Sequence, residues 1–178
     1  MTLKSRIAVA LLAISGALTV QAAEPVSRAT DALRGEKSLG IEVGYNGYNR
    51  MPQVGGRFTY RFSRLIRLAP AVEYTFRDKG RDALLFDIDV NFMFPLAQNR
   101  CALYPLVGLN YSSWNYHPVV TVPGTNDVSS RVSRAGINLG AGIDVNISGS
   151  LRLSAGAHYT FIKEFHGVVA EVGIHYRF

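Results

Sequence analysis

The sequence predicts an all-β protein, an antiparallel barrel of eight strands with up-and-down topology, and three observations support this fold class. Apolar and polar residues alternate over eight successive segments of the 178-residue chain, which is the period of a β-strand. The connections between these segments are alternately short and long. Aromatic residues make up 11% of the chain and charged residues only 18%, whereas an average soluble domain has about 25% charged residues.

The first 22 residues are expected to form a signal peptide that is removed from the mature protein. Lys4 and Arg6 supply the positive charge of such a segment, an apolar run follows over residues 7–20, and a small-residue cleavage pattern ends at Ala22. The apolar run is too short to cross a bilayer comfortably. Cleavage therefore explains this segment better than a retained membrane helix.

The mature chain is expected to begin with a short periplasmic segment over residues 23–37, partly disordered, and to continue as the barrel over residues 38–178. Each segment of the barrel puts apolar residues on one face and Gly, polar or charged residues on the other. In order, the segments are 39–46, 57–62, 66–76, 84–94, 103–112, 136–145, 151–161 and 168–178. Strands of this length cross a bilayer when they are tilted.

The connections between the segments form two classes. The short ones are 63–65, 96–100 and 147–150. The longer ones are 47–55, 77–82, 114–132 and 162–167. Outer-membrane barrels have short turns on the periplasmic side and longer loops outside. The pattern therefore predicts that both termini are periplasmic.

The position of the aromatic residues favours a membrane barrel over a soluble barrel with an apolar interior. On the apolar face they gather at both ends of the strands, with mainly Ile, Val, Leu and Ala between them. At the end with short connections they are Tyr60, Phe62, Phe92, Phe94, Tyr176 and Phe178. At the other end they are Tyr45, Tyr74, Phe76, Phe86, Tyr111, Tyr159 and Phe161. Two aromatic girdles around an apolar band are typical of barrels in the outer membrane.

The polar face predicts a filled, ion-paired lumen. It carries many Gly residues, which make room for long side chains, and equal numbers of acids and arginines. The acids are Glu42, Glu73, Asp87, Asp89, Asp144 and Glu171, and the arginines are Arg57, Arg61, Arg67, Arg134, Arg152 and Arg177. Such a balance is needed because an unpaired buried charge costs several kcal/mol. The interior of an eight-stranded barrel is just wide enough for side chains, which makes a wide pore improbable.

The eight segments, among them LYPLVGLNYS at residues 103–112 and the ending VVAEVGIHYRF at residues 168–178, resemble the small outer-membrane β-barrel family, which includes OmpX/Ail-like proteins and the barrel of OmpA. The resemblance implies that the chain resides in the bacterial outer membrane. It also implies that the barrel-assembly machinery reads a terminal signal. That signal would consist of Val172, Ile174, Tyr176 and Phe178.

The expected function is that of a non-enzymatic barrel contributing to envelope integrity or surface interaction. No catalytic, cofactor-binding or metal-binding residue is predicted, and Cys101 is interpreted as a strand residue. Expected partners are outer-membrane lipid, including lipopolysaccharide, and a protein at the surface. No cluster of basic residues suggests nucleic acid. Basic residues near the outer rim could contact anionic head groups; they are Arg50, Arg77, Lys79, Arg81, Arg131 and Lys163.

Two alternatives remain open, a lipid A-modifying enzyme and a narrow channel. The enzyme would need a nucleophile, a base and an orienting group within reach of one another. The candidate side chains are His117, His158, His166, Ser112, Ser113, Ser129 and Ser130. The spacing of these residues shows no such trio. Trp114, Tyr116 and Tyr48 are expected in the outer girdle or in a patch that contacts another protein.

Overall fold

The computed structural model describes the barrel. Its described residues are 34–178, apart from 49, 79, 97–99, 117–129 and 165. The predicted signal peptide and most of the predicted periplasmic segment lie outside the described residues. Within the described part of the chain, no helix is long and apolar enough to cross a membrane.

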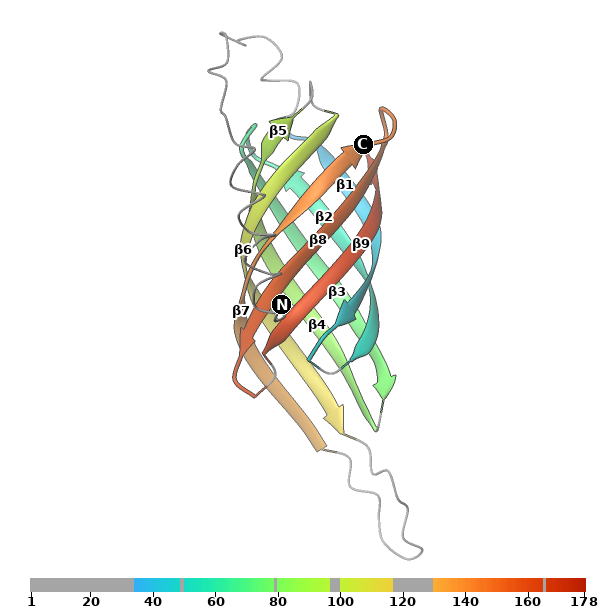
Figure 1. Cartoon of the computed structure of the whole chain (residues 1–178), viewed down its shortest axis with the longest axis vertical. Helices are drawn as coiled ribbons and strands as arrows, with labels where there is room; N and C mark the ends of the chain where they lie inside the picture. The colour runs from blue at the N-terminus through green and yellow to red at the C-terminus, as the bar shows by residue number, and fades with distance from the viewer. Residues whose placement is uncertain (1–33, 49, 79, 97–99, 117–129, 165) are drawn as a thin grey trace, which may run out of the picture. The chain divides into compact units, whose positions relative to one another are not determined.

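Nine strands form one antiparallel sheet, which closes on itself (Figure 1). They are β1 (Lys37–Asn46), β2 (Met51–Arg61), β3 (Ile66–Asp78), β4 (Arg81–Phe92), β5 (Phe94–Leu96), β6 (Cys101–Tyr116), β7 (Ser130–Asn146), β8 (Leu151–Ile162) and β9 (Gly167–Arg177). Pairing of β1 with β9 closes the barrel. Both β4 and β5 pair with β6. They are two parts of one barrel strand, and the predicted antiparallel barrel of eight strands is confirmed.

The break between β4 and β5 has a local cause in the partner strand. Asn91 pairs with Leu106 and Phe94 with Leu103, so the register is the same on both sides of the break. Pro105 lies opposite Phe92, directly before the break, and proline has no N–H to donate to the ladder. The amide of Met93 instead donates to the carbonyl of Leu65 at 2.7 Å, in the neighbouring turn.

The two ends of the barrel differ in their connections. At the turn end, residues 62–65, 97–100 and 147–150 join the strands, β1 begins and β9 ends. At the loop end, shown at the bottom of Figure 1, the connections are 47–50, 79–80, 117–129 and 163–166.

The predicted bounds of the loop-end connections were wrong, because the strands continue further. Asn46 pairs with Met51, so β2 begins well before the expected residue 57. Trp114 and Tyr116 pair with Val132 and Ser130 inside the ladder. Near their ends these strands place small or polar residues such as Pro52 and Gly56 outward, so the apolar alternation that marks the rest of each strand is lost.

The barrel is inverted relative to a soluble protein, with apolar residues outside and charged residues inside. Ile41 and Leu109 are each 65% exposed on the outer face. Arg57 and Asp89 lie on the inner face, 7% and 0% exposed. Aromatic pairs lie on the outer face near both ends, such as Tyr60 with Phe62 and Tyr159 with Phe161, with ring centroids 4.8 Å and 4.6 Å apart.

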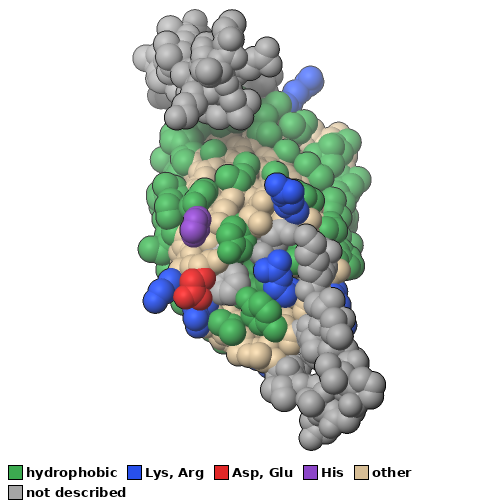
Figure 2. Space-filling model, turned by 60° about the horizontal axis from the view of Figure 1, so that its bottom comes forward, with side chains coloured by type: hydrophobic (Ala, Val, Ile, Leu, Met, Phe, Trp, Pro, Cys, Tyr) green, Lys and Arg blue, Asp and Glu red, His purple; other side chains and the backbone are tan. Residues whose placement is uncertain are grey.

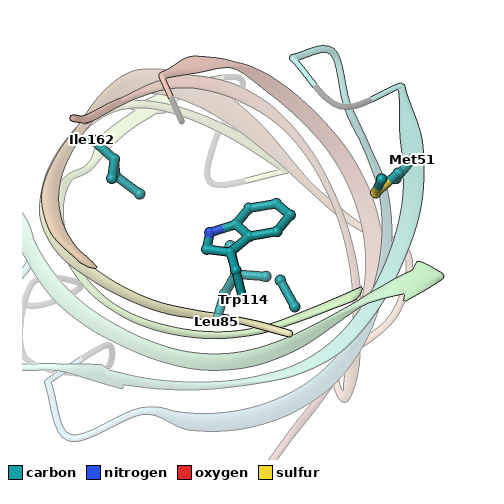
Figure 3. Packing of buried hydrophobic residues seen from close by; sticks show 5 residues of the cluster. Met51, Leu85, Trp114 and Ile162 are labelled. Carbon is teal, nitrogen blue, oxygen red and sulfur yellow. The ribbon is translucent and has the colours of Figure 1, made fainter. Parts of the chain in front are cut away.

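Two small apolar clusters lie inside the barrel. Near the loop end, Met51, Ala83, Leu85, Trp114 and Ile162 pack together, and the indole of Trp114 lies across the interior (Figure 3). The prediction that Trp114 belongs to the outer girdle or a contact patch was wrong, because its side chain is 1% exposed and its Nε1 donates to Ser112 Oγ at 3.1 Å. The second cluster contains Met93, Tyr104 and Leu106.

Candidate functional site

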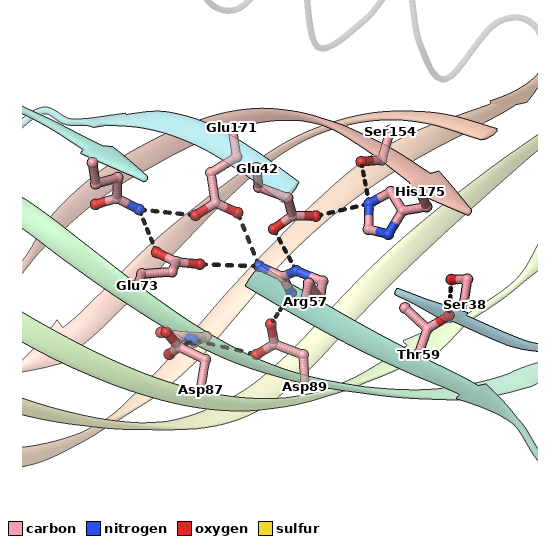
Figure 4. Close-up of polar contacts among 12 residues, drawn as sticks. Ser38, Glu42, Arg57, Thr59, Glu73, Asp87, Asp89, Ser154, Glu171 and His175 are labelled. Carbon is pink, nitrogen blue, oxygen red and sulfur yellow. Dashed lines mark hydrogen bonds and ion pairs between the residues drawn. The ribbon is translucent and has the colours of Figure 1, made fainter. Parts of the chain in front are cut away.

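The middle of the lumen is organised around Arg57 on β2 (Figure 4). Its Nε donates to Glu42 Oε2 at 2.6 Å and its Nη1 to Asp89 Oδ2 at 2.8 Å. Its Nη2 donates to Glu171 Oε2 at 3.0 Å and to Glu73 Oε1 at 3.3 Å. These acids come from β1, β4, β9 and β3, so one guanidinium connects five strands across the interior. Charge-assisted hydrogen bonds of this kind are the strong ones.

Amide side chains extend this network without adding charge. Gln53 Nε2 donates to Glu73 at 2.5 Å and to Glu171 at 2.9 Å. Asn110 and Asn138 each donate to Asp87 Oδ1 at 2.6 Å, and Asn138 also donates to Asp89 at 3.2 Å. Each carboxylate near the middle is thus held by a donor from another strand, in some cases from across the interior.

His175 on β9 joins the same network. Its Nε2 lies 3.1 Å from Glu42 Oε1 and 2.9 Å from Ser154 Oγ. Gly40 pairs with His175 across the β1–β9 ladder. A Cβ on Gly40 would overlap the imidazole ring, so the glycine provides the space that the ring occupies. We call Glu42, Arg57, Glu73, Asp87, Asp89, Glu171 and His175 the central layer.

A second group of charges lies toward the turn end. Arg152 donates to Glu36 Oε1 at 3.2 Å and to Ser38 Oγ at 2.7 Å. Arg67 pairs with Asp144, and its guanidinium lies 4.7 Å from the centre of the Tyr104 ring. We call Arg61, Arg67, Arg152, Arg177, Glu36 and Asp144 the basic layer.

The lumen charges are therefore separated along the barrel. The central layer contains one arginine and five acids, and the basic layer contains four arginines and two acids. Eleven of the twelve predicted network residues lie in one of these layers. Arg134 does not, because it is at the loop end, has a 38% exposed side chain and pairs with Glu164 at 3.4 Å.

Glu36 belongs to the basic layer, although the sequence did not predict it as a lumen residue. Its carboxylate lies 3.2 Å from Arg152 and 3.6 Å from Arg177. Glu36 precedes the first strand and was assigned to the periplasmic segment, because no alternation marks it. The inner face of β1 begins with Ser38 and Gly40 and carries no acid there. The position of Glu36 directly before this strand is the feature of the sequence that could have identified it as a lumen residue.

The candidate catalytic side chains do not form a catalytic trio among the described residues. His117 and Ser129 lie outside the described residues. His166 is exposed and lies next to the rings of Tyr48 and Tyr159. Ser154, His175 and Glu42 do meet, but serine and acid both contact Nε2 of the ring. A serine nucleophile needs the acid on the opposite ring nitrogen.

Three glutamates of the central layer have the spacing of a cation site. Oxygens of Glu42, Glu73 and Glu171 all lie within 4.8 Å of one another. The guanidinium of Arg57 contacts all three carboxylates, so its positive charge takes the place that a cation would have.

Basic side chains are spread over the loop end (Figure 2). Arg50, Arg131 and Lys163 are exposed there, and the side chain of Arg77 is 56% exposed while it pairs with Asp82. Arg81 is partly buried, and Lys79 lies outside the described residues. The predicted basic rim thus contains five described members.

No protein-family model and no curated protein matches the chain, but solved structures do. It is similar to the N-terminal β-barrel domain of OprF from Pseudomonas aeruginosa, with a TM-score of 0.59 and 17% identity over 82% of this chain and 98% of that one. It is similar to Ail, the attachment invasion locus protein of Yersinia pestis, with a TM-score of 0.60 and 18% identity over 82% and 99%.

Two further structures extend the comparison. Neisserial surface protein A matches with a TM-score of 0.61 and 13% identity over 80% of this chain and 96% of that one. Ail in complex with the heparin analogue sucrose octasulfate matches with a TM-score of 0.58 and 16% identity over 82% and 99%. The chain therefore has the fold of the small outer-membrane β-barrels, as its resemblance to them implied.

Proposed function

We propose that the chain is a non-enzymatic barrel of the bacterial outer membrane, with the turn end in the periplasm and the loop end outside. The observation that carries this proposal is the inverted burial, with an apolar outer face and a charged lumen. An apolar band of this kind is stable only in contact with hydrocarbon. The likeness to outer-membrane barrels supports the same location.

The location is tested by fractionating cells that produce the full chain. We expect the protein in the outer-membrane fraction, starting at Ala23 by N-terminal sequencing, and migrating faster on gels before boiling than after. A mature protein that remains soluble without detergent would contradict the proposal.

The role that the geometry supports best is contact between the loop end and anionic surface groups, such as lipopolysaccharide phosphates or a sulfated glycan. Arg50, Arg131 and Lys163 are exposed there. Basic residues near an anionic surface each contribute about 1 kcal/mol. The Ail complex supports this role, since that barrel was captured with a polysulfated sugar.

Binding is tested with the folded barrel in detergent and immobilised sucrose octasulfate or lipopolysaccharide. The triple variant Arg50→Gln, Arg131→Gln, Lys163→Gln should bind more weakly, and the wild-type affinity should fall as salt rises. A matched control removes Arg34, Lys37 and Arg100, which are exposed at the turn end. Equal losses in both triple variants would show a nonspecific charge effect and contradict the role.

A lipid A-modifying enzyme and a narrow channel are the second candidates, and no described contact favours either. Mass spectrometry of lipid A from cells with and without the gene tests the enzyme. A changed acyl pattern that depends on the gene would replace the non-enzymatic proposal.

A further inference from the structure

One buried arginine in the basic layer, Arg61, has acids near it but forms no direct ion pair with them. Arg61 is only 6% exposed, yet it forms no ion pair or side-chain hydrogen bond with any described residue. Its direct neighbour in the β2–β3 ladder is Arg67, a like charge that is itself buried. Like charges directly opposite each other in a sheet repel, and an unpaired buried charge costs several kcal/mol. Glu36 and Asp144 attract Arg61 without pairing with it directly, so a further negative group beside Arg61 would be favourable.

Arg61 lines a small cavity that has an excess of donors. Arg152 and Arg177 also line it. The Nε atoms of Arg61 and Arg177 have no hydrogen-bond acceptor among the described residues, and Arg152 Nε has only the 3.5 Å ion pair with Asp144 Oδ2. On the acidic side, Asp144 Oδ1 lacks a donor, while its Oδ2 pairs with Arg67 and Arg152. The second acid in the lining, Glu36, is engaged by Arg152 and Arg177. The basic layer thus retains a net positive charge after every ion pair is made.

The cavity has the size of one small ion. Its volume is about 20 Å³, whereas a single water needs roughly 10–15 Å³. It adjoins an open depression at the turn end that is lined by Gly35, Gly149 and Phe178, and Glu36 and Arg177 line both spaces. An anion that approaches from the turn end would therefore meet Arg177 and Glu36 first.

We propose that this cavity is a binding site for a small monovalent anion, either chloride or a single carboxylate group. Arg61 and Arg152 would hold it by charge-assisted hydrogen bonds, and Arg177 stands at the entrance. The planar fork of a guanidinium fits a carboxylate with two parallel hydrogen bonds. The site is independent of the role proposed for the loop end.

The test uses the folded, nitrogen-15-labelled barrel in detergent micelles, titrated with sodium formate or sodium chloride. Sodium methanesulfonate, whose anion has no carboxylate and is larger than chloride or formate, keeps the ionic strength constant. We expect a saturable shift of the side-chain Nε–Hε signals of Arg61, Arg152 and Arg177. A shift that never saturates, or no shift at all, would mean that the cavity holds only water and would overturn the proposal. Saturation by formate but not chloride identifies the carboxylate as the ligand, and saturation by both identifies a general small-anion site.

Two variants assign the binding to Arg61. Arg61→Gln should weaken it at least about tenfold, read from the Arg152 and Arg177 signals, because a hydrogen bond to a charged group is lost. Arg64→Gln, in the adjacent turn and outside the cavity, should change it by less than about twofold. If Arg61→Gln does not fold, Arg61→Lys keeps the charge but loses the fork and should bind several-fold more weakly. Unchanged affinity in a folded Arg61 variant would refute the site.

Discussion

Arg57 is the residue on which the central layer depends, because four acids share this arginine and three of them, Glu42, Glu73 and Asp89, are buried. Arg57→Met should lower the free energy of unfolding by about 3–5 kcal/mol, since removing one partner of a buried ion pair leaves the others uncompensated. Urea titration of the folded barrel in micelles measures this loss.

The control for Arg57 is the exposed Arg134–Glu164 pair at the loop end. Arg134→Met should cost less than about 1 kcal/mol, as exposed ion pairs do. Adding Glu171→Gln to Arg57→Met should recover part of the lost stability. Equal losses for the two arginine variants would show that Arg57 does not organise the lumen.

Gly40 provides a second test, of space rather than charge. Gly40→Ala would push a methyl group into the His175 ring, so we expect a loss of about 1–3 kcal/mol. Gly56→Ala is the matched control in the adjacent strand, because the nearest atom to its added Cβ is 3.8 Å away. If Gly40→Ala is as stable as Gly56→Ala, the ring does not need the space that Gly40 leaves.

At the scale of the element, the end of the last strand has two proposed roles that an experiment can distinguish, one in the folded barrel and one in its assembly. Phe178 is 66% exposed, and its amide donates to the Lys37 carbonyl at 3.0 Å. If it is also an assembly signal, Phe178→Ser should strongly reduce the amount of folded barrel in cells but change the urea midpoint of refolded protein little. Phe161→Ser, 53% exposed at the loop end, is the control. If both variants reduce the amount of folded barrel in cells equally, Phe178 is only a member of the aromatic girdle and not an assembly signal.

The strands show which features of an element can be predicted from the sequence and which cannot. Alternation assigned Glu73 and Asp87 to the lumen correctly, because facing depends only on odd or even position. It failed at Met51 and Trp114, where strands run on beyond the apolar band and polar and apolar residues no longer alternate. The end of the lipid-facing pattern was therefore mistaken for the end of the strand.

At the scale of the whole molecule, the sequence could not predict how the lumen charges are layered. Whether a side chain faces the lumen or the lipid depends only on its position within its own strand. Its height along the barrel axis depends on strand tilt and on the register between strands. Arg57 and Arg61 are four residues apart on one strand, yet the first forms ion pairs with four acids and the second forms none with any described residue. Glu36 joins the basic layer for the same reason, since the β1 register brings it beside Arg152. Equal numbers of acids and arginines thus concealed a division into an acidic and a basic layer.

The layered lumen leads to a prediction about the whole barrel, that ions do not pass through it. Trp114 and its cluster close the interior near the loop end, and Arg57 with its acids crosses the middle. Each barrier alone should suffice, so the wild type, Trp114→Ala and Arg57→Ala should all give no steady conductance in planar bilayers. The double variant, if it folds, should open a water-filled path and show discrete current steps. A control with Ile41→Ala and Leu109→Ala on the outer face should stay silent. Steps from the wild-type barrel would instead support the channel, and would mean that the central layer rearranges to let ions pass.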